Sequence, residues 1–204
     1  MDKFCVTRKS LILRASDPED HSAFEEFALY YDPFISVILH KMDIKSSDFS
    51  DLKQELLVKL WKKLKLFDID HDKSSFRGWL RTVIRNSVFE YFRKKGRDKN
   101  VELTDSLERF CGSDENNELD ALIDEEWKKH VIQIAMDHVS KLFTGHAIEV
   151  FQLTMEGVAV QDIAEKFSIR ESSVYNLRSR VKEKFQQELK NIRELLEFPD
   201  DSGE

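Results

Sequence analysis

Apolar side chains recur at spacings of three and four residues along most of this 204-residue chain, and this period constrains the fold more than any other feature. Between His21 and Lys41, such a stripe predicts an amphipathic helix that Pro33 can bend, with an apolar face made of Phe24, Phe27, Tyr31, Phe34 and Ile38. The chain contains only six Gly and three Pro, too few turn formers for many short strands. We therefore predict an all-α fold.

A second helix is expected from Ser50, a good N-cap residue, to Leu64. At 100° per residue, one half of this helix is apolar and consists of Leu52, Leu56, Leu57, Leu60, Trp61 and Leu64. The other half is mostly polar and consists of Asp51, Gln54, Glu55, Val58, Lys59 and Lys62. A polar loop over residues 68–75 then leads to a third helix from Phe76 to about Lys95.

This third helix combines arginines with aromatic rings. The side predicted to pack inward carries Phe76, Leu80, Val83, Ile84, Ser87, Val88 and Tyr91. The opposite side, with Trp79 at its border, carries Thr82, Arg85, Asn86, Phe89 and Arg93. Rings that stack on unpaired bases beside guanidinium groups that hold phosphates suit strand-separated nucleic acid. The alternative is that Trp79 and Phe89 only complete the core of a small domain.

Residues 160–181 fit a helix-turn-helix. Ala164 is small where the two helices must approach closely, and Ser172 can cap the second helix. Apolar positions that would lock the pair are Ile163, Phe167, Ile169, Val174 and Leu177. Residues left to face a DNA groove or its phosphates are Ser173, Tyr175, Asn176, Arg178, Ser179, Arg180 and Lys182. Ser168 stands where the turn usually has glycine, so a left-handed conformation there would carry some cost. An ordinary helical hairpin with a solvated basic face is the alternative.

The net charge of −7 is unevenly distributed. Basic residues dominate residues 75–97, acidic residues dominate 98–126, and basic residues lead again over 170–190. A local basic face is what matters for phosphate contact. We predict a first helical domain at 10–97, an acidic flexible linker at 98–126 and a second helical domain at 127–195. In the second domain, helices are expected from about Glu125 to Leu142 and from Ala147 to Met155, before the terminal pair.

Several classes of function are disfavoured by the sequence. No segment approaches the roughly 20 apolar residues of a membrane span, and the N-terminal residues lack a signal-peptide core, so we expect a cytoplasmic protein with no membrane partner. Cys5 and Cys111 are isolated, and no His or Cys spacing indicates a metal or a cofactor. Asp51 and Glu55 lie one helical turn apart, but no further catalytic group accompanies them, so we do not expect an enzyme.

The runs DLKQELLVKLWKKL (51–64) and FRGWLRTVIRNSVFEYFRKK (76–95) resemble region 2 of bacterial RNA polymerase sigma factors of the extracytoplasmic-function (ECF) group. Residues 142–181 are similar to region 4 of the same family. Where the family commonly has Asp, the third helix has Glu90, and the recognition helix reads Leu177–Arg178 where the family more often has a basic residue followed by an apolar one.

The resemblance implies a non-catalytic subunit that binds core RNA polymerase and directs initiation at specific promoters. Region 2 would bind the β′ clamp helices through Asp51, Gln54, Glu55, Val58 and Lys62. It would recognise and open the −10 element with Arg77, Trp79, Arg85, Asn86, Phe89 and Arg93, and the loop between Phe67 and Ser75 would capture an unpaired base. Region 4 would read the −35 element and dock on the β flap, with Ser172, Ser173, Tyr175, Asn176, Arg178, Ser179, Arg180 and Lys182 facing DNA. The resemblance also leaves room for an anti-sigma factor as a partner.

A conventional helix-turn-helix regulator that acts without core polymerase is the competing interpretation. It would account for residues 127–195, but it leaves the arginine and aromatic helix and the polar face around Gln54 and Glu55 without a function.

Overall fold

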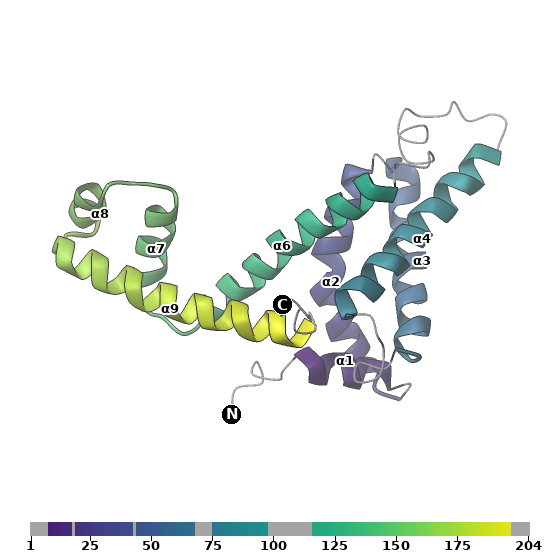
Figure 1. The fold of residues 1–204 in the computed structure, drawn as a ribbon, viewed down its shortest axis with the longest axis horizontal. Coiled ribbons are helices and arrows are strands. Elements are labelled where there is room, and N and C mark those ends of the chain that lie inside the picture. The colour runs from purple at the N-terminus through teal and green to yellow at the C-terminus, as the bar shows by residue number, and fades with distance from the viewer. Residues whose placement is uncertain (1–7, 18, 43, 68–74, 98–115, 197–204) are drawn as a thin grey trace, which may run out of the picture. The chain divides into compact units, whose positions relative to one another are not determined.

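The computed structural model describes residues 8–17, 19–42, 44–67, 75–97 and 116–196, and all regular secondary structure in these ranges is helical. The predicted all-α fold is thus confirmed. The chain divides into two compact units, Met1–Lys128 with Leu195–Glu204 (unit 1) and Lys129–Glu194 (unit 2). In chain order, the helices of Figure 1 are α1 (Arg8–Ser16), α2 (His21–Lys41), α3 (Ser46–Leu64), α4 (Phe76–Arg97), α6 (Asn116–Ser140), α7 (Ala147–Met155), α8 (Val160–Phe167) and α9 (Glu171–Leu196).

Unit 1 is built on α2, α3 and α4, which lie side by side, while α1 packs against α2 and α3 (Figure 1). Helix α2 has the predicted bounds and continues through Pro33. Asp20 caps it, because its carboxylate accepts a hydrogen bond from the Ala23 backbone N–H at 2.9 Å. Its buried face consists of Ala23, Phe27, Tyr31, Phe34, Ile35, Ile38 and Leu39.

Helix α3 begins at Ser46, so the prediction that Ser50 caps it is wrong. Asp48 favours the earlier start, because it lies in the first turn and its carboxylate receives the Tyr91 hydroxyl at 2.8 Å and the Lys95 ammonium at 2.8 Å. The predicted apolar half is confirmed for its four fully buried members, Leu52, Leu56, Leu60 and Leu64.

Helix α4 buries most of the predicted inward set, namely Phe76, Leu80, Val83, Ile84, Ser87 and Val88. The prediction is wrong at its last position, where Phe92 is buried and Tyr91 is only partly covered. Tyr91 instead lies at the edge of the core, where its ring is partly covered and its hydroxyl reaches Asp48 on α3.

The expected linker differs from the structure over residues 116–126, which form the first part of α6. Leu119, Ile123 and Trp127 are buried at intervals of four residues. The Trp127 ring lies 5.5 Å from the Phe34 ring and 6.3 Å from the Tyr31 ring, centroid to centroid. These apolar contacts tie the acidic helix to α2, so it is a structural part of unit 1. Residues 98–115 of the expected linker lie outside the described residues.

Unit 2 contains the helix-turn-helix of α8 and α9, supported by α7. Val150, Ile163, Ala164 and Val174 form one buried cluster, and Leu177 packs both on it and on a second cluster around Phe151 and Val181. Ser168 ends α8 in the left-handed conformation expected of this turn, with φ 53° and ψ 42°. Its backbone N–H points back to the carbonyl groups of Ala164 and Glu165, which terminates the helix.

Candidate functional site

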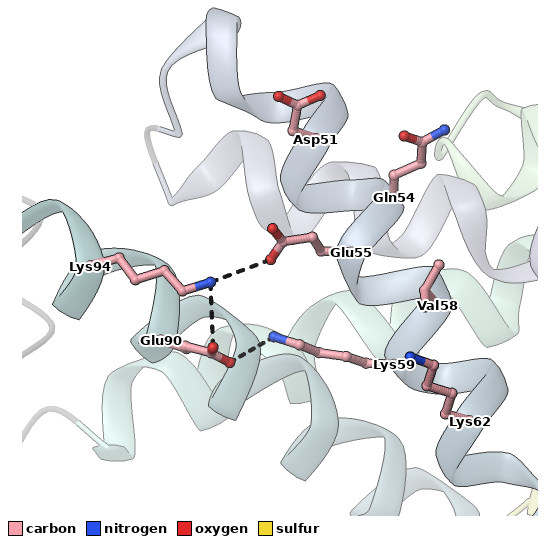
Figure 2. Close-up of a pocket in the computed structure, with 8 residues that line it drawn as sticks. All are labelled: Asp51, Gln54, Glu55, Val58, Lys59, Lys62, Glu90 and Lys94. Carbon is pink, nitrogen blue, oxygen red and sulfur yellow. Dashed lines mark hydrogen bonds and ion pairs between the residues drawn. The ribbon is translucent and has the colours of Figure 1, made fainter.

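Five polar-face residues of α3, predicted from the sequence as one binding surface, lie together in an open groove of about 670 Å³ between α3 and α4 (Figure 2). All five are exposed, Val58 at 45%. They are Asp51, Gln54, Glu55, Val58 and Lys62. Helix α3 holds them there because its opposite face is fixed in the core through Leu52, Leu56, Leu60 and Leu64.

Helix α4 supplies the other wall of the groove through Glu90 and Lys94, which sequence reasoning did not assign to this surface (Figure 2). Glu90 accepts the Lys59 ammonium at 2.7 Å and the Lys94 ammonium at 3.4 Å. Lys94 also lies 3.8 Å from the Glu55 carboxylate. The hydrogen bond from Lys59, followed by its charge and by Lys94, lowers the pKa of Glu90 below its usual value. The groove therefore has a fixed pattern of alternating charge.

A second surface lies on α4, where Thr82, Asn86 and Arg93 are exposed and Phe89 is partly exposed. These four residues share one side of the helix, as the spacing predicted. An aromatic ring beside an amide and a guanidinium group can stack on a base while the polar groups bind its edge or the backbone.

Trp79 packs against other aromatic rings of unit 1. The Trp79 ring is partly buried, 5.2 Å from the Phe67 ring and 5.3 Å from the Phe76 ring. Trp79 thus contributes to the core of unit 1, in agreement with the alternative considered for it, although part of its surface is accessible.

Two predicted DNA contacts, Arg77 and Arg85, face the acidic side of α6. Arg77 lies 2.9 Å from the Asp124 carboxylate, and Arg85 lies 3.0 Å from that of Asp120. Arg81, which sequence reasoning did not include, lies between them on the same side of α4, 3.3 Å from Asp124. The spacing of these arginines at intervals of four was visible in the sequence, but their partners were not.

In unit 2, the predicted DNA-facing side of α9 is accessible. Eight residues were predicted to face DNA here. Tyr175 is 52% exposed, and Ser173 is the one member of the set that is only partly exposed. The remaining exposed members are Ser172, Asn176, Arg178, Ser179, Arg180 and Lys182. The Arg180 guanidinium lies 5.9 Å from the Phe143 ring, a distance at which a cation–π contact orients it.

Ser172 does not cap α9, because the helix already begins at Glu171. The predicted cap is therefore wrong, and Ser172 lies within the first turn of the helix. The backbone N–H groups of Ser173 and Val174 donate to the Arg170 carbonyl oxygen at 2.8 and 3.2 Å, so the first turn is closed by the backbone.

Within the part of the chain that the structure describes, no cluster of three or more His, Cys, Asp or Glu side chains could hold a metal ion. Nor does any described helix have the length and apolar character to span a bilayer. Residues 68–74 of the expected base-capturing loop, and both cysteines, lie outside the described residues.

Comparison with known proteins adds an independent finding. Residues 27–98 match the family model of sigma-70 region 2. The match spans most of α2 and all of α3 and α4, about a third of the chain, and thus contains the groove and the exposed face of α4. No curated protein matches the chain. The region 2 match supports a sigma factor of the sigma-70 family, with a role in promoter recognition and transcription initiation.

Proposed function

We propose that the protein is an ECF-type sigma factor that binds core RNA polymerase and directs initiation at specific promoters in the cytoplasm. One observation carries the proposal. Within a segment that matches sigma-70 region 2, the five residues assigned to polymerase binding line one exposed groove on α3. Polymerase carries out nucleotidyl transfer, and this subunit supplies promoter choice and strand opening without a cofactor.

The groove is proposed to receive the β′ clamp helices. Its mixed charges and the exposed Val58 suit a partner helix that presents an apolar side chain flanked by charges. An apolar centre within a polar rim is the usual composition of a specific protein interface.

The two DNA surfaces are proposed to act on different promoter elements. Asn86, Phe89 and Arg93 on α4, with Arg77, Trp79 and Arg85 beside them, would bind the opened −10 element. Helix α9 would read the −35 element as duplex, since α8 and α9 have the helix-turn-helix connection and α9 exposes Arg178 and Asn176. Unit 2 would also dock on the β flap. The region 2 domain would then comprise residues 10–97, and the region 4 domain residues 127–195.

Co-purification with core polymerase tests the proposal. Val58→Glu replaces the exposed apolar side chain of the groove by a charged one and should abolish association, because its carboxylate must lose its water when a partner helix docks. Leu29→Glu is the matched control, since Leu29 is an exposed apolar residue on α2 outside the groove. Equal association of both variants would contradict the assigned surface.

If the wild-type protein fails to associate with polymerase but binds specific duplex DNA by itself, the second candidate function is favoured. That candidate is a helix-turn-helix regulator, and the observation behind it is the exposed α9 surface of unit 2.

A further inference from the structure

The arginine row of α4, consisting of Arg77, Arg81 and Arg85, occupies one side of the helix at intervals of four residues. Each guanidinium group is ion-paired to α6. Asp124 receives Arg77 at 2.9 Å and Arg81 at 3.3 Å, and Asp120 receives Arg85 at 3.0 Å. Two carboxylates on consecutive turns of α6 are therefore paired with three cations on α4.

Two features of α6 place these carboxylates on the row. Leu119, Ile123 and Trp127 bury the apolar side of the helix in unit 1. Glu126, which is 8% exposed, accepts the Lys41 ammonium from α2 at 2.7 Å. These contacts hold Asp120 and Asp124 beside the arginine row of α4. All of these contacts lie within unit 1.

The ion pairs are accessible to competition. Their side chains retain exposed fractions of 21–36%, so solvent and salt reach them. Asp120 is also imperfectly accommodated, since its Oδ1 atom is buried and accepts no hydrogen bond from any residue that the structure describes. These ion pairs would therefore be displaced readily by another anion that binds the arginines equally well.

We propose that Asp120 and Asp124 act as an internal substitute for DNA phosphates, so that the first part of α6 competes with promoter DNA for the arginine row. This inference rests on the proposed function, because it requires that the row binds DNA. The free protein then holds its strand-binding surface partly occupied, and the first part of α6 gives up its contacts with α4 and α2 when DNA takes its place. The acidic segment is autoinhibitory rather than a passive connector.

The test compares full-length variants by the fluorescence anisotropy of a labelled single-stranded DNA oligonucleotide at low salt. Asp120→Asn/Asp124→Asn should bind at least about fivefold more tightly than the wild type, because two competing charges are removed while the helix keeps its shape. Glu118→Gln/Glu156→Gln is the matched control, since it removes the same net charge at two exposed positions outside the row. Arg85→Gln added to the Asn variant should reverse the gain.

The outcomes separate this inference from the proposed function. If the Asn variant gains no more than the control while Arg85→Gln weakens binding by the wild type, the row binds DNA and the autoinhibition is wrong. If Arg85→Gln changes binding in neither background, the row does not contact DNA and its assignment to the −10 element fails as well.

A second measurement needs no variant. Hydrogen exchange of the wild-type protein, measured with and without the oligonucleotide, should show reduced protection over residues 119–127 when DNA is bound. Unchanged or increased protection there would overturn the proposed withdrawal of α6.

Discussion

Lys59 on α3 and Glu90 on α4, which both line the groove proposed to bind polymerase, form an ion pair of 2.7 Å (Figure 2). Glu90 also holds Lys94, so one carboxylate connects cations on both walls. The pair links α3 to α4 beside the surface where a partner helix would dock.

We expect Glu90→Gln to lower the free energy of unfolding of unit 1 by less than about 1 kcal/mol, because the ion pairs are partly exposed and screened. Its affinity for core polymerase should fall by a larger factor, since Lys59 and Lys94 lose their common anchor. Trp fluorescence measures the first quantity for unit 1 alone, because Trp61, Trp79 and Trp127 all lie in it. Glu25→Gln, at an exposed position of α2, serves as the control. A stability loss without an affinity loss would contradict the assignment.

The contact between Asp48, Lys95 and Tyr91 predicts acid sensitivity of unit 1. Hydrogen bonds from Lys95 and then from Tyr91 hold the pKa of Asp48 below its ordinary value of 3.8. The unfolded state therefore binds protons more readily in this range, so the contribution to stability is present above the unfolded pKa and is lost as the pH falls through the lower folded pKa. Glu90 contributes a pH dependence of the same sign, because its pKa is also lowered from an ordinary value of 4.5.

Thermal unfolding of unit 1, monitored by Trp fluorescence between about pH 6 and pH 3, measures this effect. Asp48→Asn should lower the Tm at pH 6 and flatten its dependence on pH below about 4.5. Parallel curves for the wild type and the variant would show that Asp48 is not responsible.

Ser168→Gly should stabilise unit 2 by about 1 kcal/mol, because a residue with a Cβ is disfavoured at φ 53° and glycine is not. Circular dichroism of the helices should show the gain as a higher unfolding temperature of unit 2. Trp fluorescence does not report this transition, because all three Trp residues lie in unit 1. Ser172→Gly is the control in the first turn of α9, where added backbone freedom should destabilise the helix. Stabilisation by both substitutions would show that the left-handed turn is not the cause.

Arg178→Ala should weaken binding to the duplex upstream element and lower the slope of log affinity against log salt by about 1, the change expected for one lost phosphate contact. Arg180→Ala should act in the same direction, since its guanidinium is oriented by Phe143 on the same unit. Lys141→Ala removes an equal charge outside α9 and should leave the slope unchanged. An unaltered slope for both arginine variants would remove them from the DNA interface.

Phe89→Ala should impair promoter opening more than closed-complex formation, because a ring that stacks on an unpaired base acts only after strand separation. Permanganate reactivity of unpaired thymines reports opening, and filter binding reports total complex. Phe89→Tyr keeps the ring and should retain opening. Equal loss of closed and open complexes in the Ala variant would contradict stacking.

The sequence predicted what depends on local periodicity. The bounds of α2, the groove residues of α3 and the exposed side of α4 all follow from apolar spacing, which sets the side of a helix that is buried. Ser168 belongs to this class too, because its conformation follows from the turn in which it stands.

The failures arose where tertiary contacts outweighed local signals. The acidic composition of residues 98–126 suggested a flexible linker, although Leu119, Ile123 and Trp127 already had helical spacing. Burial against α2 outweighs the charge repulsion over residues 116–126. Likewise, Ser50 was the better cap by type, but the partners of Asp48 come from α4 and are invisible to a local pattern. The pairing of the arginine row with α6 is inaccessible to sequence reasoning for the same reason.

Run-off transcription with purified core polymerase and promoter-containing genomic fragments tests the central claim most directly. The protein should elicit discrete transcripts that core polymerase alone does not produce, and Val58→Glu should abolish them while Leu29→Glu retains them. Absence of new transcripts, together with sequence-specific duplex binding by the protein alone, would contradict the sigma-factor assignment.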